Sequence, residues 1–280
     1  MNWQPLAVGT VVALATGLAL AWKWQLGMRK CAVAMLVLAG VIAIPLGLLV
    51  DRSSALLFIA QWLLTLGSAA ALVLWRFYRD PDRTPPSRDD VVLSPADGTV
   101  IYVRRSERGQ LPVATKNGRN YAIEDLVRRP LAGGEAVAVG ISLNFLDVHV
   151  NRAPIEGEIT VARRIPGLFG SLRRPEMAFE NERATITIRG GDLQVAVVLI
   201  ASRLVRQIVT FVRAGDQVGL GQRLAAIRLG SQVDLVLPAR PDLEVAVQPG
   251  DVVRAGESVV ALVAAPEKAP VTQADQRVGT

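Results

Sequence analysis

The chain has 280 residues, a net charge of +6 and one cysteine. A single cysteine excludes an intrachain disulfide, so a reducing cytoplasm suits the protein. The length is enough for one ordinary domain and a further region. A basic balance is typical of proteins that bind nucleic acid or anionic lipid, and composition alone excludes neither.

Three long apolar runs begin the chain, and they lie at Leu6–Trp22, Cys31–Val50 and Ala55–Trp75. About 20 apolar residues, at 1.5 Å of rise each, cross a hydrocarbon core of roughly 30 Å. The first run is slightly short, but it is not typical of a signal peptide, because no basic residue precedes it and no small-residue cleavage site follows. We predict a membrane region of about three transmembrane helices in residues 1–76.

Basic residues around these runs predict the orientation of the chain. Lys23, Arg29 and Lys30 lie between the first two runs, and Arg76 and Arg79 follow the third. Because basic loops stay on the cytoplasmic side, the N-terminus is expected outside and the C-terminal part in the cytoplasm, at the inner cell membrane. The positive charge then indicates attraction to anionic lipid head groups and not to nucleic acid.

After residue 77 the pattern changes to apolar runs of four to eight residues, rich in Val, Ile and Thr and separated by Gly, Pro and Asp. This pattern predicts a mainly β soluble domain over residues 77–266. Arg79–Asp90 is polar and contains three prolines, so it is predicted to be an extended linker. Residues 267–280 lack apolar periodicity and are predicted to be a disordered tail.

An internal repeat lies in the last third of the chain. Val212–Ile227 and Val247–Leu262 share the frame V-x-x-G-D-x-V-x-x-G. The Gly-Asp step and the later Gly are turn residues, so each copy predicts two short strands with equivalent bends. Two such copies resemble the biotinyl/lipoyl domain, a flattened β-sandwich. That resemblance places Ser231 where the family carries its modified lysine, and there is no lysine here to hold lipoate or biotin.

His149 is the only histidine of the chain. If its segment is a strand, alternation places Asp147, His149 and Asn151 on one face. An imidazole between groups that can orient it has the chemistry of a site. The same three residues also fit an ordinary polar strand face.

Two further polar motifs have ordinary structural readings of their own. Ser94–Gly98, "SPADG", carries the carboxylate of Asp97, and it is also a typical hairpin turn. Glu180–Arg183, "ENER", is a charged cluster that reads by itself as a solvated loop.

Five motifs taken together are more specific: "FYRDPDR", "SPADG", "DVHVNR", "ENER" and "RLGSQVDLVLP" follow one another from Phe77 to about Leu262. In this order they resemble the phosphatidylserine decarboxylases, most closely the shorter bacterial and archaeal-like branch. Members of that family are made as proenzymes that cut themselves at a Gly-Ser bond.

The resemblance implies that Ser231 Oγ attacks the carbonyl of Gly230 and forms an ester. β-Elimination and hydrolysis then leave a covalent pyruvoyl group, the pyruvate cofactor, at the new N-terminus. The β chain would be Met1–Gly230 and the α chain Ser231–Thr280. Serine needs a base and the base an orienting group, and these roles fall on His149 and Asp97.

The resemblance also implies the second reaction and the partners. The pyruvoyl carbonyl condenses with the amine of phosphatidylserine and accepts the electrons released as CO2 leaves. His149 then protonates the product, phosphatidylethanolamine. No metal and no nucleic acid is expected; the partners are phosphatidylserine, membrane lipids and the two chains themselves, and a homo-oligomer is left open.

Two positions depart from the family pattern: Gln232 replaces a small hydroxyl or basic residue, and Arg152 stands where some relatives have a second histidine. Three other readings stay open. The chain could be a membrane-anchored lipoyl-like adaptor without activity, an inactive member of the family, or a decarboxylase of archaetidylserine, an ether-linked lipid.

Overall fold

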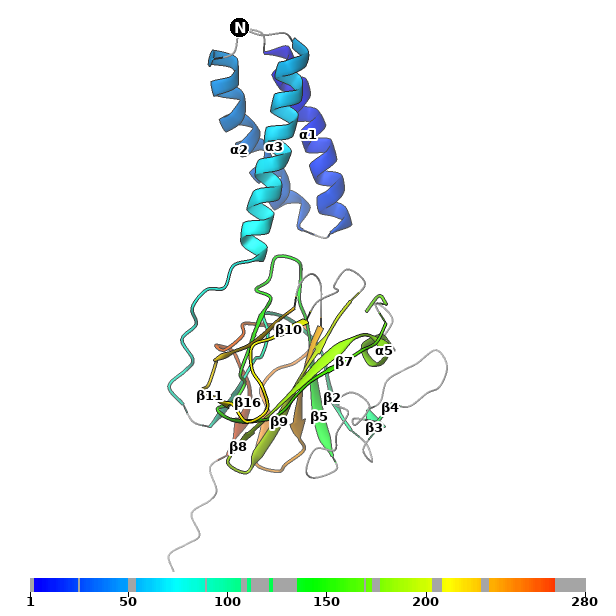
Figure 1. Cartoon of the computed structure of the whole chain (residues 1–280), viewed down its shortest axis with the longest axis vertical. Coiled ribbons are helices and arrows are strands. Elements are labelled where there is room, and N and C mark those ends of the chain that lie inside the picture. The colour runs from blue at the N-terminus through cyan, green and yellow to red at the C-terminus, as the bar shows by residue number, and fades with distance from the viewer. Residues whose placement is uncertain are drawn as a thin grey trace, which may run out of the picture.

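The computed structural model describes residues 3–24, 26–49, 54–88, 90–106, 110–111, 121–122, 135–168, 170–172, 177–202, 208–227 and 232–264. A bundle of three helices stands on one end of a β-rich domain, and an extended segment joins the two (Figure 1). The predicted tail, residues 267–280, lies outside the described residues.

The helices are α1 (Gln4–Lys23), α2 (Met28–Leu49) and α3 (Ser54–Phe77). All three are long and apolar enough to cross a membrane, which confirms the three predicted helices, the short first one included. The buried amide of Gln61 on α3 ties them together, donating to Thr10 Oγ1 at 3.1 Å and to the Ala39 carbonyl at 3.0 Å. Such hydrogen bonds between helices replace contacts that water cannot provide inside a bilayer.

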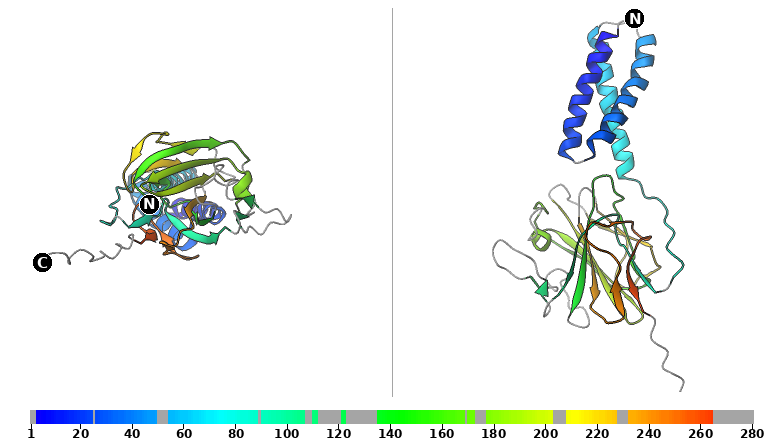
Figure 2. Two further views of the ribbon diagram at one scale, coloured as in Figure 1. Left: turned by 90° about the horizontal axis from the view of Figure 1, so that it is seen from below. Right: turned by 180° about the vertical axis from the view of Figure 1, so that it is seen from behind.

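The N-terminus lies at the end of the bundle farthest from the β domain, and α3 leads down into that domain (Figures 1 and 2). If the three helices cross a membrane, the N-terminus and the β domain are therefore on opposite sides. Residues 79–88 contain no helix or strand and run along the outside of the domain (Figure 1). This is the extended linker that its prolines predicted.

The β domain contains one large antiparallel sheet of eight strands, in the order β11-β7-β8-β9-β13-β5-β2-β15, which curls along its length (Figures 1 and 2). Two three-stranded sheets, β1-β16-β14 and β10-β12-β6, and a two-stranded sheet, β3-β4, accompany it. The described strands are β1 (Val91–Leu93), β2 (Gly98–Arg105), β3 (Gln110–Leu111), β4 (Tyr121–Ala122), β5 (Ala136–Ser142), β6 (Val150–Arg152), β7 (Gly157–Ile165), β8 (Arg183–Gly190), β9 (Leu193–Ile200), β10 (Ile208–Thr210), β11 (Gln217–Val218), β12 (Arg223–Ile227), β13 (Gln232–Pro238), β14 (Leu243–Val245), β15 (Val252–Val253) and β16 (Val259–Val263), with one short helix, α5 (Met177–Glu180). The predicted mainly β domain is confirmed.

The central strand β13 explains how the sheet is buried. All seven of its residues are buried, Gln232 and Asp234 included, and the strand lies between β5 and β9. Val233, Leu235 and Leu237 face the main core, while Val236 packs in a smaller cluster with Phe179 of α5 on the other face.

The two copies of the repeat fold alike. Gly215 and Gly250 take φ angles of 94° and 102°, which only glycine adopts readily. The aspartate after each glycine accepts a hydrogen bond from the backbone N–H three residues before it, at 2.8 Å and 2.9 Å. The later glycines, Gly221 and Gly256, have φ angles of 71° and 73° and lie against each other. The equivalent bends predicted from the shared frame are confirmed.

Candidate functional site

The turn that carries Asp97 and the segment that carries His149 lie side by side. The Arg152 N–H donates to the Pro95 carbonyl at 2.9 Å, and the Leu93 N–H donates to the Pro154 carbonyl at 2.8 Å. Residues some 60 positions apart in the chain thus become neighbours at one end of the domain.

The last described residue before Gly230 and Ser231, Ile227, lies beside His149. Gly230 and Ser231, the predicted cleavage site, lie outside the described residues, and so does the predicted pyruvoyl position. Their neighbours are placed: the Ile227 N–H donates to the His149 carbonyl at 3.0 Å, and Gln232 starts β13 between Ser142 and Ile200. The chain therefore leaves β12 at Ile227, beside His149, and re-enters the central sheet five residues later, at Gln232.

His149 has a defined tautomer. The residue is 4% exposed, and Nδ1 lies 2.8 Å from the carbonyl oxygen of Asp147. Because a carbonyl only accepts, Nδ1 carries the proton and donates it, which leaves Nε2 as the basic nitrogen. Nε2 is buried and has no hydrogen-bond partner among the described residues. This buried basic nitrogen is therefore free to accept a proton, as far as the described residues are concerned.

Burial lowers the pKa of His149 from its ordinary 6.5, because the charged imidazolium is poorly solvated there. The hydrogen bond to Asp147 and the negative charges of Asp147 and Asp97 act in the opposite direction, and the Arg79 charge adds to the lowering. The net effect keeps the imidazole neutral at neutral pH, the state that a general base requires.

The strand face predicted for Asp147, His149 and Asn151 is wrong, because β6 begins only at Val150. The Asp147 carboxylate turns away and accepts the Asn144 N–H at 2.7 Å, while Asn151 donates to the Pro95 carbonyl at 3.3 Å. It is the backbone of Asp147, and not a side chain on a shared face, that orients the histidine.

Asp97 is held by other groups than His149. Its carboxylate accepts two hydrogen bonds from Arg83 Nη2, at 3.2 Å and 2.9 Å, and one from the Ala255 N–H at 2.8 Å. Within the described part of the chain no hydrogen bond joins Asp97 to His149. Gly98 follows with φ 153°, and a Cβ there would clash with the carbonyl of Ser142. The orienting contact expected between Asp97 and His149 is therefore absent, and Asp97 acts on the histidine only through its charge.

A buried polar network adjoins the position after the predicted cleavage site. Gln232 Nε2 donates to Asp234 Oδ1 at 2.7 Å and to the Tyr102 hydroxyl oxygen at 3.0 Å, and that hydroxyl donates to Asp234 Oδ2 at 2.6 Å. The Tyr102 ring covers Gly140, where a Cβ would clash with it. Burial raises the pKa of Asp234 from 3.8 to about 6, although its two donors oppose the rise. The sequence analysis missed this network, for which an aspartate inside the apolar run "QVDLVLP" was the signal.

The reading of "ENER" as a solvated loop is wrong. Asn181, Glu182 and Arg183 are all less than 8% exposed. The Asn181 side chain accepts a hydrogen bond from the Gly170 N–H and donates to the Gly170 carbonyl. It also donates to the Ala201 carbonyl at 2.8 Å. The motif ties α5 to the end of β9, beside Gln232 in the same sheet.

The family of the chain follows from comparison with known proteins. The family model described as phosphatidylserine decarboxylase matches residues 70–261. A phosphatidylserine decarboxylase proenzyme of Symbiobacterium thermophilum is 38% identical over 217 residues, 76% of this chain and 90% of the relative. The chain belongs to the phosphatidylserine decarboxylase family. The resemblance read from the five motifs is thereby confirmed.

Two more relatives show the breadth of the family. A phosphatidylserine decarboxylase proenzyme of Mycolicibacterium gilvum is 38% identical over 203 residues, 72% of this chain and 79% of the relative. A proenzyme of Methanocaldococcus jannaschii, named as a candidate archaetidylserine decarboxylase, is 38% identical over 186 residues, 66% of this chain and 87% of the relative. The family match begins inside α3, so α1 and α2 lie outside it.

In this member of the family the helix bundle touches the histidine directly. The ring of Phe77, the last residue of α3, lies 4.4 Å from the ring of His149. Phe145, in the loop before His149, lies 5.2 Å from Phe77 and stacks on Trp24 at 5.8 Å with an angle of 6° between planes. The loop that carries the histidine is thus seated on the domain-side ends of the helices.

Arg152, where some family members have a second histidine, holds the linker. Its guanidinium donates to Asp80 at 3.2 Å and to the Pro81 carbonyl at 2.9 Å. Arg223 reaches the other Asp80 oxygen at 2.5 Å. Because Asp80 and Pro81 lie only three and four residues after the end of α3, these contacts fix the helix bundle relative to the site. Within the described residues, no cluster of three or more His, Cys, Asp or Glu side chains is placed to hold a metal ion.

Proposed function

We propose that the protein is a phosphatidylserine decarboxylase proenzyme, which cuts itself between Gly230 and Ser231 and then converts phosphatidylserine to phosphatidylethanolamine and CO2. The observation that carries the proposal is the orphaned Nε2 of His149, a residue whose carbonyl oxygen anchors Ile227, three residues before Gly230. The names of the relatives, which are proenzymes, support it.

In the first reaction His149 is the general base. A serine hydroxyl is a weak nucleophile until a base removes its proton. The neutral imidazole takes that proton from Ser231 on Nε2 while Nδ1 stays bonded to the Asp147 carbonyl, which stabilises the imidazolium that forms. Ser231 Oγ then attacks the Gly230 carbonyl, and the imidazolium gives its proton to the Ser231 nitrogen, so that an ester bond forms as the peptide bond breaks.

Asp97 supports this base without touching it. Burial lowers the pKa of His149, and the nearby negative charge of Asp97 offsets part of that loss. The carboxylate also keeps its turn in place through Arg83 and the Ala255 N–H. We therefore propose Asp97 as a positioning and electrostatic residue of the catalytic group that it forms with His149 and Ser231.

In the second reaction the pyruvoyl group at position 231 supplies an electron sink for the bond to the departing carboxyl group. The residues around it fit this use, because the basic Nε2 of His149 is unoccupied by any described partner and Gln232 is fixed by Tyr102 and Asp234. His149 Nε2 would first take a proton from the ammonium group of the substrate and would then deliver it to the carbon that loses the carboxyl group.

The helix bundle provides access to a lipid. We propose residues 1–76 as the membrane region and residues 77–266 as the catalytic domain, facing the cytoplasm at the inner membrane. The basic residues at the domain-side ends of the helices favour that side. Phe77 contacts His149 directly, so a head group at the bilayer surface lies close to the site.

The two matching turns also support a finer view of the fold. We propose that the repeat forms a lipoyl-like unit, which presents residues 228–231 after its first copy as lipoyl domains present their lysine. The equal φ angles of Gly215 and Gly250 favour it.

A second candidate substrate is archaetidylserine, which the name of the Methanocaldococcus relative favours. The same serine head group reacts in both lipids, and they differ in the linkage of their chains. Parallel assays of CO2 release with the ester-linked and the ether-linked lipid compare the two.

The mass of the purified protein tests self-cleavage. We expect two chains that end and begin at the 230/231 bond, with a pyruvoyl group on the shorter one, and a single uncut chain for Ser231→Ala. The chain offers a matched control, because Gly170-Ser171 is a second Gly-Ser step: Ser171→Ala should cleave as the wild type does. A folded, uncut wild-type protein would contradict the proposal and favour the adaptor or an inactive member.

A further inference from the structure

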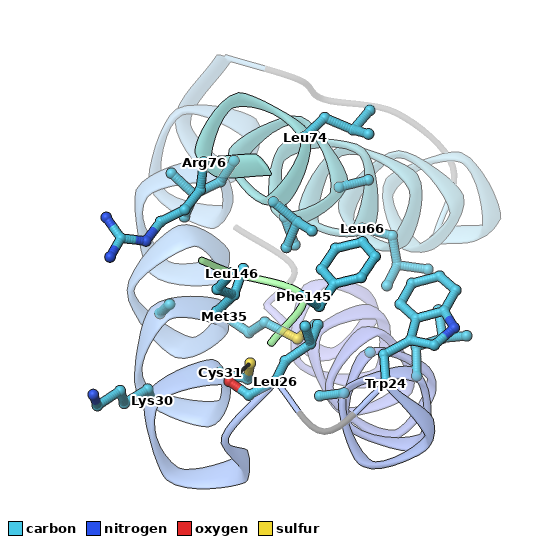
Figure 3. A pocket seen from close by; sticks show the side chains of 18 of the residues that line it. Trp24, Leu26, Lys30, Cys31, Met35, Leu66, Leu74, Arg76, Phe145 and Leu146 are labelled. Carbon is cyan, nitrogen blue, oxygen red and sulfur yellow. Dashed lines mark hydrogen bonds between the residues drawn. The ribbon is translucent and has the colours of Figure 1, made fainter. Parts of the chain in front are cut away.

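A cavity of about 750 Å³ opens between the three helices at their domain-side end (Figure 3). Its volume lies within the ~300–1,000 Å³ of ligand pockets. Side chains from all three helices line it, and nearly all are apolar; Ala34 and Leu38 of α2 and Leu66 of α3 are examples. Such a lining offers few hydrogen bonds to water, so the part of a ligand that fills it must be apolar as well.

The β domain closes one end of this cavity. Phe145 and Leu146, from the loop that carries His149, reach between the helices and line its floor (Figure 3). The Leu146 carbonyl accepts a hydrogen bond from Arg79 at 2.7 Å, just after α3, which keeps the loop in place. The cavity is therefore shared between the bundle and the catalytic loop and is not a simple gap in the bundle.

A continuous series of rings leads from the cavity to the histidine. Phe145, on the floor, lies 5.2 Å from Phe77, and Phe77 lies 4.4 Å from His149. The floor of the cavity is thus separated from the proposed base by only two aromatic rings.

Two cations stand at the same end of the bundle. Lys30 and Arg76 line the cavity, and their charged ends point away from its centre on one side (Figure 3). Neither makes an ion pair within the described part of the chain. A ligand that combines an apolar chain with a phosphate at one end matches both the lining and these charges.

We propose that the cavity holds an acyl chain of the substrate phospholipid and that Lys30 and Arg76 attract its phosphate, so that the head group is presented to His149. This inference rests on the proposed function and names the site that binds the lipid tail. A chain gains little free energy by leaving one apolar surrounding for another. The cavity therefore contributes position, which raises turnover of long-chain lipid, more than it contributes affinity.

Cross-linking with wild-type protein tests occupancy. A phosphatidylserine with a photoreactive group in its acyl chain is incorporated into detergent micelles, and the labelled residues are found by mass spectrometry. We expect labelling of the lining residue Leu38 above that of Val37, which is 61% exposed on the same helix. Excess dioleoyl phosphatidylserine should remove the label better than dioleoyl phosphatidylcholine. Equal competition by both lipids, or equal labelling of both residues, would mean that ordinary membrane lipid fills the cavity, and it would overturn the inference.

A kinetic test uses Ala34→Trp, which fills the cavity, and Val37→Trp, which does not. The measured quantity is kcat/KM on dioleoyl phosphatidylserine divided by kcat/KM on glycerophosphoserine, which has no acyl chains. We expect Ala34→Trp to lower this ratio about ten-fold, as for a blocked apolar subsite, and Val37→Trp to leave it unchanged. An unchanged ratio for Ala34→Trp overturns the inference.

Two controls keep the results distinct. Self-cleavage of each variant reports that it folds, and Ala70→Trp on α3 replaces Ala34→Trp if the latter fails to cleave. If the wild-type protein releases CO2 from neither substrate, the proposed function fails, whereas the cross-linking pattern still decides whether the cavity binds the chain.

Discussion

The carbonyl oxygen of Asp147 accepts a hydrogen bond from Nδ1–H of His149, with 2.8 Å between nitrogen and oxygen. This one contact determines which nitrogen is basic, because it leaves the lone pair on Nε2. A backbone carbonyl has no charge to lose at low pH, so the tautomer does not depend on the ionisation of a partner. The pH dependence of the base then follows the imidazole, whose pKa also responds to the charges of Asp147, Asp97 and Arg79.

Self-cleavage should therefore follow the protonation of His149. Burial lowers its pKa from 6.5, so the base is neutral at neutral pH and becomes charged only in more acidic solution. We expect the cleavage rate to rise with pH through a midpoint below 6.5 and to stay constant above it. Time courses of freshly made protein from about pH 5 to about pH 8 measure this. A midpoint above 7 would exclude His149 as the base, and His149→Ala should remain uncut throughout.

Arg83 should be essential for the turn that carries Asp97. Its side chain is 8% exposed and pairs with Asp97 at 2.9 Å and Glu257 at 3.0 Å. Arg83→Ala leaves a buried carboxylate without its partner, which costs about 3–5 kcal/mol of unfolding free energy. Urea titration followed by circular dichroism measures the loss.

Arg88→Ala is the matched control, since Arg88 pairs with Asp90 on the surface, where water screens the charges. The unfolding free energy of this variant should stay close to the wild-type value. An equal effect of the two substitutions would contradict the importance of the buried pair.

The helices were predictable because length and apolar composition are local properties. The run at Cys31–Val50 and the helix at Met28–Leu49 differ by only a few residues. The repeat was predictable for the same reason, because the positive φ of Gly215 and Gly250 depends only on the few residues of each turn. The number of strands in the large sheet was not, because it depends on pairing between distant segments.

The site residues were predictable as types but not as contacts. Asp97 was expected beside His149, yet its partner is Arg83 from the linker, which no periodicity relates to it. "ENER" reads as a solvated loop until Asn181 is seen to bond Gly170 and Ala201, both distant in the chain. Long-range hydrogen bonds decide both cases, and a single sequence carries no signal for them.

Tyr102→Phe should weaken the buried network beside the cleavage site. The substitution removes the hydroxyl that donates to Asp234 at 2.6 Å and accepts from Gln232 at 3.0 Å. Leaving a buried group unsatisfied costs about 1–3 kcal/mol, so the unfolding free energy should fall by that amount. Tyr78→Phe, at a tyrosine that is 63% exposed, should change it little. Equal stability of both variants would show that the hydroxyl contributes nothing.

The ionisation of Asp234 should destabilise the folded protein, whereas an ordinary ion-paired carboxylate stabilises it when it ionises. Burial raises its pKa from 3.8 to about 6, so the folded state favours the protonated form. The contribution to stability is thus complete below pH 3.8 and is lost as the pH rises through about 6. At 1.36 kcal/mol per pKa unit the loss is on the order of 3 kcal/mol.

Asp234→Asn removes this titration while it keeps the size of the side chain. We expect the melting temperature of Asp234→Asn minus that of the wild type to become more positive as the pH rises from about 4 to about 7. Thermal unfolding in detergent, followed by circular dichroism at several pH values, measures the difference. Asp192→Asn is the control, because this exposed aspartate has its pKa lowered by Arg240, so its own effect has the opposite sign. A difference that does not change with pH would mean that Asp234 titrates as an ordinary carboxylate and that the network does not bury its charge.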